Sequence, residues 1–175
     1  MHRMSETVAI ELGLAKPAEA PVLARMSRDY IENGLRWRWQ AGQIRALIRD
    51  PDTVTLCARS QPLRRQDVPR SASGYGQGDI LGFGVMTYAF DTAHLMLLAV
   101  VPRARRRNIA SNLLKWLETT AVTAGVGRIE LEVRAGNAPA RSFYREHGYH
   151  EREYLAGYYS GQESAFRMAR SLRPS

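Results

Sequence analysis

The stretch Leu95–Ala124, LMLLAVVPRARRRNIASNLLKWLETTAVTA, decides the fold. It opens with an apolar run that Pro102 closes, and because proline cannot donate a hydrogen bond to a neighbouring strand, the run predicts a buried strand. From Asn108 to Gly125 apolar residues recur at helical spacing, as Ile109, Ala110, Leu113, Leu114, Leu117 and Ala121. Between strand and helix lie four arginines, Arg103, Arg105, Arg106 and Arg107.

A basic turn that leads into a helix is typical of a site for a phosphorylated ligand. The N-terminus of a helix presents unpaired backbone N–H groups and a partial positive charge. Guanidinium groups add charge and paired hydrogen bonds that suit phosphate. We therefore expect an anionic cofactor where this strand, turn and helix meet.

The chain before this stretch predicts three strands and two helices. Strand patterns cover Val8–Leu12, Thr53–Ala58 and Ile80–Tyr88. Two helical patterns lie between the first two strands, one ended by Gly34 and one by Asp50-Pro51. Residues 60–78 lack periodicity and are expected to form a flexible insertion. Alternate glycines in the third strand, Gly82 and Gly84, predict a close approach by another element.

The chain after this stretch predicts two more strands and a helix. Arg128–Val133 alternates as a strand, Ala138–His147 forms a short helix, and Tyr149 begins another strand. Tyr154–Gly161 is aromatic and rich in turn residues, Ser164–Ala169 could close the sheet, and Arg170–Ser175 should fray. The fold class expected is α/β: one domain over residues 1–175, with a mostly antiparallel mixed sheet of six or seven strands flanked by helices.

Composition limits the class of protein. With 175 residues, 45% of them hydrophobic, the chain can bury a single core and is too short to favour a second domain. No apolar run approaches the roughly 20 residues that cross a bilayer, and the start lacks the pattern of a secretory signal, so we expect a cytoplasmic protein without a membrane partner. Cys57 is the only cysteine and the four histidines are scattered, so no metal site is predicted.

The chain is strongly basic, with a formal net charge of +8. This charge admits nucleic acid as a partner, but the arginine clusters lack the interleaved aromatics that stack on bases, so nucleic acid is not favoured. The cluster after Pro102 has an explanation in a polyanionic cofactor. The second cluster, residues 59–70, is interpreted as a solvated loop.

Two ordered motifs resemble those of the GNAT superfamily of acyl-CoA-dependent N-acyltransferases. The first is Arg105–Ala110, RRRNIA, which matches Arg/Gln-x-x-Gly-x-Gly/Ala except that Asn108 replaces the first glycine. Asparagine tolerates positive φ better than other non-glycine residues and also caps helices. The second motif runs from LEVR at residues 131–134 through Asn137, Ala140 and Phe143-Tyr144 to Gly148-Tyr149. With the later pair Tyr158-Tyr159, these residues most resemble the bacterial ribosomal-protein N-terminal alanine acetyltransferases.

The resemblance implies a site for acetyl-CoA. In it, Leu98, Ala99 and Val100 present backbone groups to the pantetheine arm, and the Val100 N–H bonds the thioester oxygen. Asn137 bonds the same arm from the next strand. The pyrophosphate lies on the turn formed by Arg105, Arg106, Arg107, Asn108, Ile109 and Ala110. No metal is implied.

The resemblance also assigns the proton steps of a direct acetyl transfer. Tyr144 would protonate the departing thiolate and Glu132 would serve as general base, through water. Each has a plainer interpretation: Glu132 and Glu130 as solvated residues on the polar face of a strand, and Tyr144 as a residue packed on the core. Cys57 lies outside both motifs, so no acyl-enzyme is expected.

The acceptor is expected to be a primary amine on a protein N-terminus, a lysine or a small molecule. Trp37 and Trp39 lie in a connection between helices, where they could cover a core edge or contact the acceptor; the resemblance favours contact. The basic chain does not suit cationic acceptors such as ribosomal proteins. A rival hypothesis is a catalytically silent module that senses CoA or binds nucleic acid. Either a monomer or a homodimer is compatible with the sequence.

Overall fold

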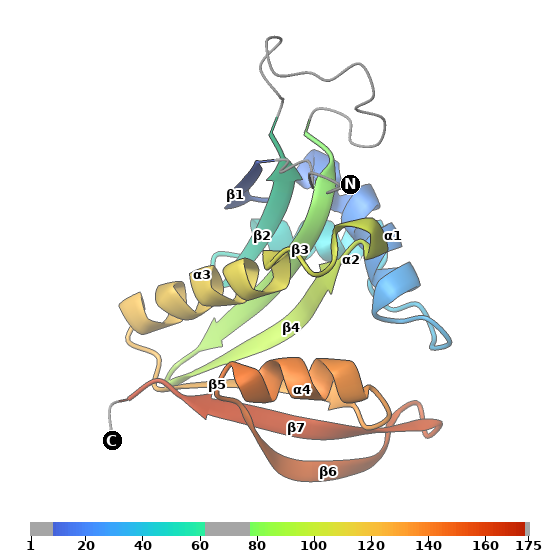
Figure 1. The fold of residues 1–175 in the computed structure, drawn as a ribbon, viewed down its shortest axis with the longest axis vertical. Helices are drawn as coiled ribbons and strands as arrows, with labels where there is room; N and C mark the ends of the chain where they lie inside the picture. The colour runs from blue at the N-terminus through green and yellow to red at the C-terminus, as the bar shows by residue number, and fades with distance from the viewer. Residues whose placement is uncertain (1–8, 62–77, 174–175) are drawn as a thin grey trace, which may run out of the picture.

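A computed structural model describes residues 9–61 and 78–173. Its seven strands form one sheet in the order β1-β2-β3-β4-β5-β7-β6 (Figure 1). The strands are β1 (Ile10–Leu14), β2 (Thr53–Ser60), β3 (Ile80–Ala89), β4 (Thr92–Val100), β5 (Arg128–Arg134), β6 (His150–Tyr159) and β7 (Glu163–Ser171). The helices are α1 (Ala20–Tyr30), α2 (Ala41–Arg49), α3 (Ile109–Thr123) and α4 (Ala138–Glu146), with single 3-10 turns η1 (Pro17–Glu19) and η2 (Pro102–Ala104).

The sheet is mixed, as predicted. All neighbouring strands pair antiparallel except β4 and β5, which run parallel. A parallel pair needs a long crossover, and α3 supplies it. Figure 1 shows α3 across one face of β2, β3 and β4, with α1 and α2 on the other face. The α/β fold with helices on both faces is therefore confirmed.

The alternate glycines of β3 let α3 lie close to the sheet. A Cβ on Gly84 would come within 2.9 Å of Leu117 Cδ1, and a Cβ on Gly82 within 3.1 Å of Ile109 Cγ2. A side chain at either position would therefore force the facing side chains of α3 to shift, and glycine avoids this. The predicted close approach is confirmed, and the approaching element is α3.

Two expectations about the C-terminal part were wrong. Residues 154–159, expected to be turn-rich, belong to β6, and the turn residues there mark a break in register between Leu155 and Tyr159 where Gly157 has a φ of 60°. Arg170 and Ser171, expected to fray, belong to β7 and pair with β5. Arg170 also donates to Glu118 on α3 at 2.8 Å, which ties the strand end down.

The expected insertion and the second arginine cluster fall mostly outside the described residues, at positions 62–77. Arg59, the first arginine of that cluster, is not in a solvated loop. It lies in β2, donates to Glu19 at 2.7 Å and 2.9 Å, and also bonds the carbonyl of Leu14. Cys57, on the same strand, is fully buried as predicted. None of the helices described is long and apolar enough to cross a membrane.

The sheet splits between β4 and β5. The two strands pair only over Thr92–His94 and Arg128–Glu130, and no register continues beyond those residues in the described chain. β5 instead stays with β7 along its whole length. Figure 1 shows the two strands diverging, so beyond His94 this edge of β4 pairs with no other strand in the described chain.

Candidate active site

A cavity of about 950 Å³ occupies the split between β4 and β5. Its walls are residues 95–98 of β4 and residues 132–134 of β5, and Asn137, Ala140 and Tyr144 contribute from α4 and its start. The connection between α1 and α2 covers it from one side, and Tyr158–Ser160 at the end of β6 cover it from the other. This volume is in the range of sites that bury an extended small-molecule ligand.

Backbone groups of β4 point into this opening. Val101 donates its N–H to the Leu81 carbonyl on β3 at 2.8 Å. Because backbone groups alternate in direction along an antiparallel strand, Ala99 and Leu97 also face β3, while Val100 and Leu98 face away from it. The Val100 carbonyl accepts from Arg105 Nε at 3.2 Å, which ties the basic turn to this strand edge. Of the three β4 residues predicted to contact a cofactor, Leu98 lines the cavity.

The turn from β4 to α3 contains two non-glycine residues with positive φ. Asn108 precedes α3 in the left-handed region, with a φ of 59°, and Arg106 has a φ of 62°. The prediction that asparagine supports the positive φ normally given to glycine is confirmed. Its side chain makes no capping bond, so the expected helix cap is not formed. The residues of Arg105–Ala110 do not line the cavity itself; they lie at the end of β4 beyond it.

Replacing Asn108 tests whether backbone conformation is what this position supplies. Asn108→Gly should change the acetyl-CoA dissociation constant by less than about threefold, roughly 0.7 kcal/mol, because both residues adopt positive φ. Asn108→Val should weaken binding by about tenfold or more, since a β-branched residue opposes that conformation. Calorimetric titration with acetyl-CoA measures both. A large gain in affinity for Asn108→Gly would instead mark the natural turn as degenerate.

Glu132 lies almost buried on β5 between two basic partners. Its side chain is 9% exposed, Oε2 is 2.6 Å from His94 Nε2, and Oε1 accepts from Arg167 Nε at 3.0 Å. Burial alone would raise the pKa of Glu132, but the hydrogen bonds from His94 and Arg167 outweigh it and the net pKa is lowered. The solvated interpretation is therefore wrong for Glu132, whereas Glu130 is partly exposed and pairs with Arg128.

His94 is a titratable residue of this cavity that the sequence did not single out. It ends the paired part of β4, opposite Glu130, and its half-exposed ring lines the cavity beside Glu132. A signal existed, since this histidine directly precedes the apolar run that predicts the central strand. Recognising it required the parallel register of β4 and β5, which the sequence does not give.

Tyr144 and Asn137 reach the cavity from the other side of the split. Asn137 begins α4, and its Oδ1 accepts from the Ala140 N–H at 3.1 Å, which leaves the amide N–H₂ to donate to a ligand. The Tyr144 ring packs edge-on against Tyr149 with centroids 5.7 Å apart. Burial, with a smaller effect from Tyr159, raises the pKa of the Tyr144 phenol above its ordinary value. The structure thus brings Glu132, Asn137 and Tyr144 to one cavity.

The α1–α2 connection is held over the cavity by Glu32. This carboxylate is buried and accepts from Ser27 Oγ at 3.0 Å and from the Arg38 N–H at 2.7 Å, with longer contacts to the Trp39 N–H. Trp37 donates to the Trp39 carbonyl at 3.1 Å. Both tryptophans pack against the core and also line the cavity, so the core-edge interpretation is confirmed and contact with the acceptor stays a prediction.

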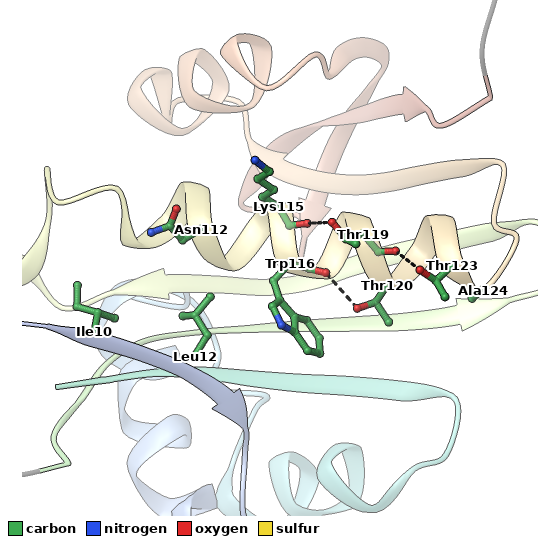
Figure 2. A pocket seen from close by; sticks show the side chains of 9 residues that line it. All are labelled: Ile10, Leu12, Asn112, Lys115, Trp116, Thr119, Thr120, Thr123 and Ala124. Carbon is green, nitrogen blue, oxygen red and sulfur yellow. Dashed lines mark hydrogen bonds between the residues drawn. The ribbon is translucent and has the colours of Figure 1, made fainter. Parts of the chain in front are cut away.

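A second hollow lies on the outer face of α3 beside β1, with a volume of about 820 Å³ (Figure 2). Its hydroxyl groups are already bonded within the helix, because Thr119, Thr120 and Thr123 donate to carbonyls one turn earlier. Lys115 is the single charged residue among those lining it. This hollow lacks the convergent acid and base groups that the split offers.

Comparison with known proteins gives matches of sequence and of fold. The model of the Acetyltransferase (GNAT) family matches residues 34–149. The [ribosomal protein bS18]-alanine N-acetyltransferase of Salmonella typhimurium is 37% identical over 90 residues, which is 50% of this chain and 61% of that protein. Alignments cover between 46% and 64% of the lengths of the first curated relatives.

Two solved structures share the architecture. The ribosomal-protein-S18-alanine N-acetyltransferase of Escherichia coli superposes with a TM-score of 0.73 at 19% identity, covering 95% of this chain and 96% of that one. Arabidopsis thaliana NAA60 in complex with acetyl-CoA superposes with a TM-score of 0.73 at 19% identity, covering 94% and 99%. At these identities the superpositions show a common fold.

Proposed function

Because this chain belongs to the Acetyltransferase (GNAT) family, we propose that it transfers an acetyl group from acetyl-CoA to a primary amine. One observation carries the proposal: the split between β4 and β5 opens a cavity in which Glu132 and Tyr144 lie with the free edge of β4. Amine attack on a thioester needs a proton acceptor, a proton donor and donors for the carbonyl oxygen, and this cavity offers all three.

The free edge of β4 is proposed to hold the acetyl-CoA arm. The N–H groups of Leu98 and Val100 face the split, so the Val100 N–H is available to polarise the thioester carbonyl, as the resemblance implies. Asn137 would donate from the opposite side. The pyrophosphate would lie at the start of α3, where the backbone N–H groups of the helix N-terminus adjoin the basic residues Arg105–Arg107.

Glu132 and His94 are proposed to remove the proton of the incoming ammonium. A carboxylate with a lowered pKa is a weak proton acceptor by itself, but it orients and stabilises a neighbouring imidazole as that group gains a proton. Imidazole both accepts and donates protons near neutral pH, and the ring of His94 is half exposed at the cavity. The proton would thus pass from the amine, through water or directly, to the His94–Glu132 pair.

Tyr144 is proposed to protonate the thiolate as the C–S bond breaks. Because the pKa of Tyr144 is raised, its phenol stays protonated over the pH range in which an amine loses its proton. The hydroxyl can therefore donate a proton to the thiolate. The bond to nitrogen forms as the bond to sulfur breaks, and the thiol leaves with the tyrosine proton. The ammonium loses its first proton to the His94–Glu132 pair before attack. The second proton, which leaves the nitrogen after it has been acylated, restores the tyrosine through solvent.

The acceptor is proposed to enter beneath Trp37 and Trp39. Two of the relatives named above are alanine N-acetyltransferases of a ribosomal protein by name. A protein N-terminus is therefore the acceptor we propose. One continuous sheet that contains strands from both ends of the described chain supports a single domain over residues 1–175.

Binding and turnover with acetyl-CoA test the proposal. At a hundredfold excess over its dissociation constant, acetyl-CoA should stabilise the fold by roughly 2.7 kcal/mol, measured as a thermal shift. Thiol release should then appear with at least one member of a panel of peptides and amines. A thermal shift without turnover for any acceptor would favour a silent CoA-binding module, and no shift at all would remove acetyl-CoA as the ligand.

A further inference from the structure

The entrance of the cavity carries two exposed arginines. Arg36 and Arg38 lie in the α1–α2 connection, line the cavity and are exposed to solvent. Within the part of the chain that the structure describes, neither forms an ion pair with an acidic side chain. The Arg38 guanidinium lies over the ring of Trp39, 4.9 Å from its centroid. Both guanidinium charges are therefore available to pair with a ligand that enters the cavity.

The carboxylates that line the cavity do not balance these charges. The Glu32 carboxylate already accepts hydrogen bonds from Ser27 and from backbone N–H groups of the same connection. The Glu132 carboxylate is already hydrogen-bonded to His94 and Arg167. The third lining arginine, Arg134, donates to the carbonyls of Ile31 and Asn33 and so holds the α1–α2 connection itself. The field at the entrance is consequently positive.

The positive charge of Arg38 acts across the entrance. Burial and the charge of Glu132 raise the pKa of Tyr158, on the facing strand β6, while the charges of Arg167 and Arg38 act in the opposite direction. Arg38, Tyr158 and Glu132 all line this cavity, and Arg38 is exposed to solvent, so an acceptor that reaches Glu132 enters the cavity that Arg38 lines. An extended peptide advances about 3.3 Å per residue, and the side chains of its first few residues would pass these arginines.

We propose, on the basis of the acetyl transfer argued above, that the acceptor is a protein N-terminus followed by acidic residues. Carboxylates just after the reacting amine would pair with Arg36 and Arg38 on the rim, where charge governs approach and choice of partner. A cationic N-terminus would meet like charge at the same place. This acceptor class differs from cationic acceptors such as ribosomal proteins, which the resemblance to ribosomal-protein acetyltransferases would suggest.

Three peptides of one design test this proposal. Each begins with alanine; the next three residues are Asp-Asp-Glu, Asn-Asn-Gln or Arg-Arg-Lys, and the remainder is constant and neutral. Thiol release at saturating acetyl-CoA should give kcat/KM highest for the acidic peptide, about tenfold above the neutral one, and lowest for the basic one. Raising the salt concentration to 1 M should remove most of this preference because it screens exposed charges.

The double variant Arg36→Gln/Arg38→Gln identifies the source of the preference. It should lose about tenfold in kcat/KM on the acidic peptide, through KM, with little change on the neutral peptide or in acetyl-CoA affinity. The matched control is Arg49→Gln/Arg152→Gln, which removes the same net charge from exposed positions outside the cavity lining. It should leave the preference intact.

The outcomes separate the two proposals. Turnover that is equal for the three peptides, or greatest for the basic one, overturns the acidic acceptor and leaves acetyl transfer standing. A preference that survives in Arg36→Gln/Arg38→Gln also overturns it. Turnover confined to small amines removes a peptide acceptor. Absence of turnover with every acceptor, although acetyl-CoA binds, removes the transfer itself.

Discussion

Replacing Tyr144 by phenylalanine should lower kcat by about 10²–10⁴-fold while acetyl-CoA still binds. Phenylalanine keeps the ring, and with it the edge-on packing on Tyr149 and Phe143, so the change removes one hydroxyl group from the cavity. If that hydroxyl supplies the thiolate proton, the loss appears in kcat and kcat/KM together. Steady-state thiol release and a thermal shift with acetyl-CoA measure the two effects separately.

The neighbouring tyrosine provides the control for this variant. Tyr149 is fully buried, and its hydroxyl donates to Glu118 on α3 at 2.9 Å, away from the cavity lining. Tyr149→Phe should cost stability, on the order of 1–3 kcal/mol for an unsatisfied buried partner, and leave kcat within a few-fold of the wild type. A Tyr144→Phe variant that retained wild-type kcat would remove the acid assignment.

The order of elements could be predicted from the sequence because local patterns determine it. The apolar run before Pro102, the stripe of α3 and the alternation of β5 each reflect burial on one face, which is a property of neighbouring residues. The close approach at Gly84 was also visible, although the helix that makes it was not. The limits of β6 and β7 were misjudged because Gly157 and Gly161 suggested turns, whereas pairing with β7 carries the strand past Gly157.

The chemistry at the split was only partly predictable. Glu132 and Tyr144 stood out through their motifs, but their surroundings depend on contacts between distant segments. His94 and Glu132 are 38 positions apart, and Arg167 is 35 positions beyond Glu132, so no local pattern links them. The same is true of Glu32, whose carboxylate organises the connection that carries Trp37 and Trp39. Such contacts follow from the register of the strands and the path of a loop.

Acid should reveal the stabilising role of the Glu132 ion pairs. The pKa of Glu132 is lower in the folded protein than its ordinary value, so its carboxylate adds stability above the pKa of the unfolded state, about 4.3 for glutamate. That contribution is lost as the pH falls through the folded pKa. The difference in unfolding free energy between wild type and Glu132→Gln, measured by urea denaturation, should therefore be constant near neutral pH and shrink below about pH 4.

Glu132→Gln should also lose most of its activity at neutral pH, about 10²–10⁴-fold in kcat/KM, and recover part of it in alkali. Glutamine keeps the shape of the side chain but cannot take up a proton or stabilise a protonated His94. A free peptide amine has a pKa of about 8, so at higher pH the substrate arrives neutral and needs no base. The variant's rate should therefore rise with pH through the titration of the amine.

Three comparisons decide whether Glu132 acts as a base or only as a support. His94→Gln should show the same recovery in alkali if His94 and Glu132 act as one proton acceptor, and the double variant should be little worse than either single one. Arg167→Gln keeps the carboxylate and the imidazole, so its rate should not recover in alkali as that of Glu132→Gln does. In Tyr144→Phe the deficit should stay constant across the titration of the amine, because supplying a neutral amine does not replace a missing acid. A constant deficit in Glu132→Gln as well would show that the carboxylate supports the site without taking part in proton removal.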